Sequence, residues 1–233
     1  MYSRILMVGR RTFCRDGGFR VRLPSVVRYA DAVRERIVAP ILNRIAGVSN
    51  NKTIMGTKAA DRLVETICRA GIRRIYAVAG DSLNEVNDAV RRAGTVEWVH
   101  MRHEESGAFA ASAEAQLNGI ACCAGSSGPG HVHLVNGLYD AQRSNASVLA
   151  IASTCATDEF GTQYFQETEP LKLFGDCSGY CQMAATPAQL ARMLPAALQY
   201  AVHRKEVAVV GLPGDVAAAE AAGAPGAPGR RPA

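Results

Sequence analysis

The chain has 233 residues, of which 48% are hydrophobic and 20% are charged, and its formal net charge is +5. This balance is typical of a globular protein of one or two domains with a sizeable core. No stretch is apolar over the roughly 18 residues that a membrane-spanning helix needs, so the composition argues against a membrane span.

The positive charge lies in the first part of the chain. Residues 1–52 carry 11 basic and 3 acidic side chains, whereas residues 53–233 have a small acidic excess. Because aromatic residues are not interleaved with these arginines, we expect no nucleic acid to bind there. We interpret residues 1–52 as a poorly ordered Arg-rich extension, either a mitochondrial targeting segment or an overextended start ahead of Met55.

Residues 53–216 form the predicted domain, in which helical and strand-like segments alternate. In chain order, we expect a helix at 58–70, a strand at 75–78, a helix at 82–92 capped by Ser82, a strand at 96–99, a helix at 104–118, a strand at 120–125, a helix at 131–142, a strand at 148–152, a helix at 166–174, a strand at 181–184, a helix at 187–203 capped by Thr186, and a strand at 207–212.

Most of the predicted strands are continuous apolar runs, which is typical of a parallel sheet covered on both faces. The sequence therefore predicts an α/β fold: a doubly wound, mainly parallel six-stranded sheet with helices on both faces. Residues 217–233 are rich in Ala, Gly and Pro, a composition typical of a linker or tail. The odd number of cysteines, seven, and the lack of an apolar signal segment at residues 1–9 favour reduced thiols in a cytoplasmic protein.

Three loops follow predicted strands and carry unusual residues. Ligands of a doubly wound sheet bind outside the carboxyl ends of its strands, where residues 80–82, 102–105 and 126–130 are expected to lie. The glycines of the last loop allow another molecule to approach the backbone, although a tight turn explains them equally well. Glu104 and Glu105 open a helix, where acids also complement the helix dipole, and the small residues after them allow another surface to approach.

Six motifs, in this order, resemble the N-terminal, pyrimidine-binding domain of thiamine-diphosphate-dependent enzymes. They are AGDSLN at 79–84, RHEESGAFAASAEAQL at 102–117, AGSSGPGHVHLVNGLYDAQR at 124–143, VLAIAS at 148–153, YFQET at 164–168 and LPGDV at 212–216. Within that superfamily, GDSLN, RHEE and YFQET are most similar to pyruvate oxidase and quinone-dependent pyruvate dehydrogenase. The resemblance covers about residues 56–217.

The resemblance implies a catalytic role for Glu104. Its carboxyl group would hydrogen-bond the pyrimidine N1′ of thiamine diphosphate, which favours the imino form that takes the proton from thiazolium C2. Glu105 would face solvent or an interface, and His103 would orient the surroundings of Glu104. The pyrimidine pocket would be lined by Gly80, Ser127, Gly128, Pro129 and Gly130, and the substrate side by Phe165 and Gln166.

The histidines on the predicted helix after the glycine turn are not expected to bind metal. His131 and His133 are two residues apart, so their side chains point to different faces, and we interpret them as surface or interface histidines. Cys177 and Cys181 have no second pair at the spacing of a zinc site. No metal ligands are predicted in this chain.

The resemblance implies oxidative decarboxylation of pyruvate or a similar 2-keto acid by a homo-oligomer. Family members also use FAD and Mg²⁺, but no Gly-Asp-Gly motif for holding the diphosphate occurs in the 233 residues. We therefore expect a truncated enzyme that is inactive alone. Residues 161–164 lack the adjacent histidines of decarboxylases, which argues against a simple pyruvate decarboxylase. A fragment of acetolactate synthase or another 2-keto acid enzyme, and a non-catalytic dimerisation module, are the alternatives.

Overall fold

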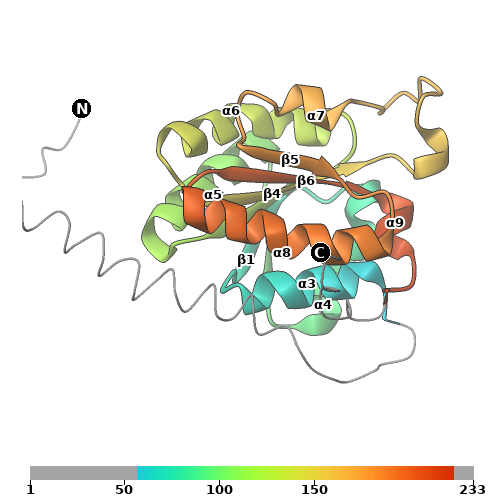
Figure 1. Cartoon of the computed structure of the whole chain (residues 1–233), viewed down its shortest axis with the longest axis horizontal. Helices are drawn as coiled ribbons and strands as arrows, with labels where there is room; N and C mark the ends of the chain where they lie inside the picture. Colours follow the sequence, from blue (N-terminus) through green and yellow to red (C-terminus); the bar gives the residue numbers. More distant parts are fainter. Residues whose placement is uncertain (1–56, 223–233) are drawn as a thin grey trace, which may run out of the picture.

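A single parallel sheet organises residues 57–222, the part of the chain that the computed structural model describes (Figure 1). Its strand order is β2-β1-β3-β4-β6-β5, and every neighbouring pair is parallel. The strands are β1 (Arg74–Ala77), β2 (Glu97–His100), β3 (Ala121–Gly125), β4 (Val148–Thr154), β5 (Tyr180–Met183) and β6 (Val207–Pro213). The predictions for residues 1–52 and 223–233 lie outside the described residues.

Helices cover both faces of the sheet, which confirms the predicted α/β doubly wound fold (Figure 1). One core lies under α3, α4, α8 and α9, and the other lies under α5 and α6. The helices are α3 (Ala59–Arg69), α4 (Asn84–Ala93), α5 (Glu104–Asn118), α6 (Pro129–Arg143), α7 (Pro170–Leu173), α8 (Pro187–Arg204) and α9 (Gly214–Ala218), with 3-10 turns η2 (Asp81–Leu83) and η3 (Thr157–Glu159).

The strands are apolar runs because successive side chains enter different cores. Cys122 packs into the core under α3 and α8, whereas Cys123 packs into the core under α5 and α6. The same alternation along β4 sends Leu149 to one face and Ala150 to the other. The central strands β3, β4 and β6 are buried along their whole length, as the continuous hydrophobic pattern predicts.

Two predicted helix boundaries are wrong for local reasons. The helix predicted at 166–174 is only α7, because the residue before Pro170 is sterically disfavoured in the helical conformation. Ser82 lies within η2 and does not cap α4, which begins at Asn84. The Ser82 hydroxyl instead accepts a hydrogen bond from the Ser127 backbone N–H at 2.9 Å. Thr186 caps α8 as predicted, with its hydroxyl accepting from Gln189 N at 3.1 Å.

Regular structure continues past residue 216, where the sequence places the end of the domain. Helix α9 continues to Ala218, and Lys58 forms an antiparallel bridge with Glu220. None of the helices within residues 57–222 has both the length and the hydrophobicity required to cross a bilayer.

Close packing of α5 against α6 depends on the absence of a side chain at Gly137. A Cβ atom there would lie 2.5 Å from Ala108 Cβ and 2.8 Å from the Phe109 backbone nitrogen. These contacts are shorter than van der Waals separations, so any larger residue would push the two helices apart. The Ala-rich stretch that follows Glu104 is therefore the surface on which α6 rests.

We expect Gly137→Ala to lower the free energy of unfolding by about 1–2 kcal/mol, which urea denaturation can measure. Overpacking costs about 1–3 kcal/mol, and the 2.5 Å contact with Ala108 puts this substitution in the upper half of that range. The better helix propensity of alanine offsets about 1 kcal/mol of that cost. Gly214→Ala is the matched control, because the nearest atom to its Cβ would be 3.7 Å away. Equal stability of the two variants would contradict this account of the α5–α6 contact.

Candidate functional site

The predicted site residues meet at the carboxyl edge of the sheet. Helix α5 begins a few residues after β2, α6 begins a few residues after β3, and η2 follows β1. Because these strands are parallel, the three loops lie at the same edge. Glu104 is the first residue of α5, and Pro129 is the first residue of α6.

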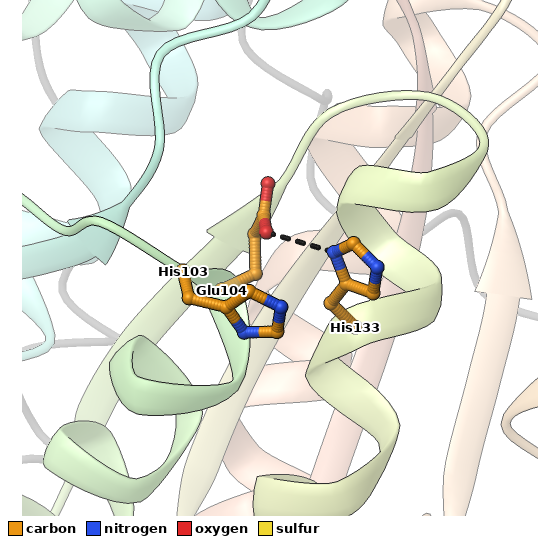
Figure 2. Close-up of side chains that lie close together, drawn as sticks. All are labelled: His103, Glu104 and His133. Atoms are coloured by element: carbon orange, nitrogen blue, oxygen red, sulfur yellow. Dashed lines mark hydrogen bonds and ion pairs between the residues drawn. The ribbon is translucent and has the colours of Figure 1, made fainter.

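Glu104 is a buried carboxylate whose two oxygens have different surroundings (Figure 2). The residue is 8% exposed, and its Oε2 lies 3.1 Å from His133 Nδ1 on α6, which can donate a hydrogen bond to it. No described residue hydrogen-bonds the second oxygen, Oε1. A Cβ on Gly130 would lie 3.4 Å from Oε1, so glycine leaves open the space beside this oxygen.

Two histidines flank Glu104 and come from different helices (Figure 2). His103 is the N-cap of α5, where its Nδ1 accepts a hydrogen bond from Glu105 N at 3.3 Å. Its ring stacks on the ring of His133, with centroids 4.4 Å apart. The Glu105 side chain is 39% exposed and accepts a hydrogen bond from Asn136 Nδ2 at 2.6 Å.

The glycine turn is held to its neighbours by serine side chains. The hydroxyls of Ser82 and Ser126 are 3.1 Å apart, and Ser127 Oγ donates to Gln166 Oε1 at 3.0 Å. Gly80 permits this arrangement, because a Cβ there would collide with the side chain of Ser126. Gly128 has a φ of +64°, which favours glycine. The structure thus brings Gly80 and the turn of residues 127–130 together; their role in lining a pyrimidine pocket stays a prediction.

The two residues predicted on the substrate side, Gln166 and Phe165, are divided between a cavity and the surface. A cavity of about 210 Å³ is lined by Ser127 and Gln166, with Tyr164 and the acidic side chains of Asp81 and Glu159 among the other lining residues. Phe165 is 81% exposed. Glu104 does not line this cavity; within the glycine turn, Gly128 lies next to Gln166 and Gly130 lies next to Glu104 Oε1.

His131 is fully buried, so the prediction of a surface or interface position for it is wrong. Its Nδ1 donates to the Ser153 carbonyl at 2.7 Å, which leaves Nε2 of the neutral ring to accept from the Thr168 hydroxyl. Burial lowers the pKa of His131, and the bond to the Ser153 carbonyl opposes this only in part. The ring thereby ties the start of α6 to the loop that carries Phe165 and Gln166.

The described cysteines are structural thiols. All six are free, and four of them are buried: Cys122, Cys123, Cys155 and Cys177. Burial raises the pKa of Cys123 to about 12 and that of Cys177 to about 11, so both thiols are protonated at neutral pH. A protonated, enclosed thiol is a poor nucleophile and a poor metal ligand.

The sequence of this domain matches the model of a known family. The model of the thiamine pyrophosphate enzyme family, N-terminal TPP binding domain, matches residues 57–173. The chain belongs to this family.

Three relatives illustrate the family. An uncharacterized 42.6 kDa protein of Pseudomonas amyloderamosa is 53% identical over 172 residues, covering 73% of this chain and 43% of that protein. The putative thiamine pyrophosphate-containing protein YdaP of Bacillus subtilis is 37% identical, covering 68% and 28%. Pyruvate oxidase of Lactiplantibacillus plantarum is 36% identical, covering 63% and 24%. Chloroplastic acetolactate synthases also match, over 112 residues. The chain thus spans less than half the length of these relatives.

The lowered pKa of His131 predicts a stability that falls at acidic pH. Below about pH 6.5 the unfolded chain takes up a proton at His131, whereas burial disfavours this protonation in the folded chain. The free energy of unfolding therefore decreases below that pH, and His131 contributes at most about 1.4 kcal/mol per pH unit to the decrease. In His131→Asn, the free energy of unfolding measured by urea denaturation should change less between pH 7.5 and pH 5.5 than in the natural chain. His100→Asn, at an exposed position, should retain the dependence, and an unchanged slope in His131→Asn would refute the assignment.

Proposed function

We propose that this domain binds the pyrimidine half of thiamine diphosphate and that Glu104 activates it, within an enzyme of the pyruvate oxidase or quinone-dependent pyruvate dehydrogenase type. The observation that carries the proposal is the buried Glu104 carboxylate, with Oε2 beside His133 and Oε1 beside Gly130. Membership of the thiamine pyrophosphate enzyme family supplies the cofactor class.

The residues around Glu104 fit the pyrimidine ring. Oε1 has no hydrogen-bond partner among the described residues, and Gly130 leaves the neighbouring space uncovered. A planar heterocycle can therefore approach this oxygen edge-on, and Glu104 can hold a proton between Oε1 and N1′. The hydrogen bond from His133 keeps the other oxygen in place, so the orientation of the carboxyl group is set before the ring arrives. When bound, thiamine diphosphate supplies the electron sink for cleaving a 2-keto acid.

The cavity beside the glycine turn is the proposed substrate side. Ser127 Oγ donates a hydrogen bond to Gln166 Oε1. The Nε2 group of Gln166 can then donate to the carboxylate of a small 2-keto acid such as pyruvate. Asp81 and Glu159 make this cavity acidic, so a positive charge or further donors must come from outside residues 57–222 to bind an anion tightly. Phe165 adds an exposed apolar wall to the same loop.

The whole enzyme is proposed to be a cytoplasmic homo-oligomer that also uses FAD and Mg²⁺. Exposed apolar side chains on α5 and α6 support assembly, since a surface of this kind is usually covered by a partner: Phe109, Leu117, Val132 and Tyr139. The free thiols of the described residues are in keeping with a reducing compartment. In this proposal, FAD and Mg²⁺ bind to the further domains that family members carry in addition to the pyrimidine-binding domain.

Two other functions remain candidates. The similarity to acetolactate synthases favours a second 2-keto acid enzyme of the same superfamily. A non-catalytic dimerisation module would use the exposed face of α5 and α6 alone. Product analysis separates the first alternative, because acetolactate contains two pyruvate units less one carbon dioxide, whereas pyruvate oxidation yields acetate or an acetyl ester. The non-catalytic dimerisation module is excluded if substitution of Glu104 abolishes the chemistry of the bound cofactor.

Glu104→Gln should remove cofactor activation. When residues 57–222 replace the equivalent domain of Lactiplantibacillus plantarum pyruvate oxidase, we expect this variant to slow deuterium exchange at C2 of bound thiamine diphosphate by about 10²–10⁴-fold, because the amide cannot exchange a proton with N1′. Glu105→Gln, whose side chain contacts Asn136 instead, is the matched control. Similar exchange rates in both variants would exclude the activating role of Glu104.

Saturation-transfer NMR on the 233-residue chain provides a test that needs no assembled enzyme. Pyrimidine protons of thiamine should receive saturation from the natural chain and much less from Glu104→Gln. The natural chain alone should show no pyruvate-dependent reduction of ferricyanide when thiamine diphosphate, FAD and Mg²⁺ are present.

Gln166→Ala should weaken substrate binding in the same chimera. A hydrogen bond to a charged group contributes about 1.5–3 kcal/mol, so KM for pyruvate should rise by roughly 10- to 100-fold while C2 exchange is unchanged. Gln182→Ala, at an exposed position on β5, should leave KM unchanged. An unaltered KM in Gln166→Ala would place the substrate elsewhere.

A further inference from the structure

Glu104 belongs to a cluster with the two histidines that flank it (Figure 2). One ligand atom from each of His103, Glu104 and His133 lies within 4.8 Å of the other two. The cluster draws on two helices, because His103 and Glu104 start α5 whereas His133 lies on the first turns of α6. The spacing that excludes His131 and His133 as a metal pair therefore does not exclude His133 as the partner of His103 and Glu104.

We infer that His103, Glu104 and His133 form a binding site for a transition-metal ion of the Zn²⁺ class. Two imidazoles and one carboxylate, with a fourth position open to water, are a ligand set of zinc sites in proteins. Imidazole ligands favour Zn²⁺, Cu²⁺ or Ni²⁺ over Mg²⁺ and Ca²⁺, which prefer oxygen. The site is therefore different in kind from the Mg²⁺ that accompanies a bound diphosphate.

The geometry needs only small side-chain movements. A tetrahedral ion with bonds of about 2.1 Å holds its ligand atoms roughly 3.4 Å apart, so the present separations of up to 4.8 Å must shorten by roughly 1.4 Å at most. His103 and His133 have side chains that are 47% and 43% exposed and can rotate, whereas Glu104 is 11% exposed and is held at the start of α5. The carboxylate Oε2 already lies 3.1 Å from His133 Nδ1.

The surrounding charges allow a cation at this position. Each helix N-terminus contributes about half a positive charge, and α5 and α6 both begin here. The carboxylates of Glu104 and Glu105 offset these two termini, and Glu105 Oε2 lies 3.8 Å from His103 Nδ1. Because these charges roughly cancel, the affinity for the ion depends mainly on its coordination by the two imidazoles. A bound ion would use the same carboxylate that is proposed to meet the pyrimidine ring.

Isothermal titration of Zn²⁺ into the chelator-treated 233-residue chain tests the inference. We expect binding of one ion per chain. His103→Asn keeps a good helix N-cap, and His133→Gln keeps an amide donor for Glu104, but both remove an imidazole. Each variant should weaken Zn²⁺ binding at least about tenfold. The chain has five histidines, and His100→Ala with His203→Ala, both at exposed positions, is the control that should leave binding unchanged.

Co²⁺ absorption identifies the ligands independently. Visible bands of a tetrahedral ion that disappear in His103→Asn would support the cluster. A near-ultraviolet band from a cobalt–thiolate bond, or Zn²⁺ binding that is equally strong in the His103→Asn/His133→Gln double variant, would overturn the inference. The metal test and the cofactor test can fail separately. If the chain does not bind Zn²⁺ but the chimera exchanges deuterium at C2 normally, only the metal site is rejected. If the chain binds Zn²⁺ but Glu104 has no effect on C2 exchange, only the proposed function is rejected.

Discussion

The packing of α5 directly on α6 is the contact on which the candidate site depends. Gly137 lets the α6 backbone rest on Ala108 and Phe109 of α5, and a side chain at that position would separate the helices. This contact brings the N-terminal turns of both helices together, so that Glu104 lies beside Gly130 and His133. A modest displacement of either helix would separate the carboxylate from both neighbours, because a hydrogen bond tolerates only a few tenths of an ångström.

The glycine turn between β3 and α6 contacts both parts of the candidate site. Gly130 lies beside the free oxygen of Glu104, and Ser127 lines an acidic cavity together with Gln166. His131, which follows the turn, holds it to the loop of Gln166, because its neutral ring bonds both the Ser153 carbonyl near the end of β4 and Thr168. The enclosed histidine gives the loop of residues 164–168 a fixed anchor that the loop's own sequence, mostly polar and partly exposed, would not supply.

Glu104 is also the point at which two kinds of ligand would compete. A carboxylate that is largely removed from water binds few partners, but it binds them strongly, because little solvent screens its charge. His133 occupies one oxygen in the described structure. The other oxygen is suited to a heterocycle nitrogen, and the pair of imidazoles next to it is suited to a transition metal. The same local feature, two helix starts meeting at a glycine turn, thus underlies both proposals.

Much of the architecture follows from local sequence. Buried strands must be apolar on both faces, so the runs around Cys122 and Leu149 predicted a covered parallel sheet, and topology then placed the loops of Glu104 and Gly130 at one edge. The predictions that failed concern residues for which two local structures compete, and only tertiary contacts decide between the two. Ser82 bonds Ser127 instead of capping a helix, and Pro170 shortens the helix predicted at 166–174.

The sequence by itself determined the sheet, the family and the position of Glu104 at a helix start, because hydrophobic periodicity and ordered motifs are properties of short segments. Only the tertiary structure decided that His131 is buried and that His103 and His133 stack beside Glu104. His103 and His133 are 30 residues apart in the chain and belong to different helices, α5 and α6. Their meeting depends on how closely α5 and α6 approach, which is set by Gly137 and the alanines of α5 and cannot be read from spacing along the chain.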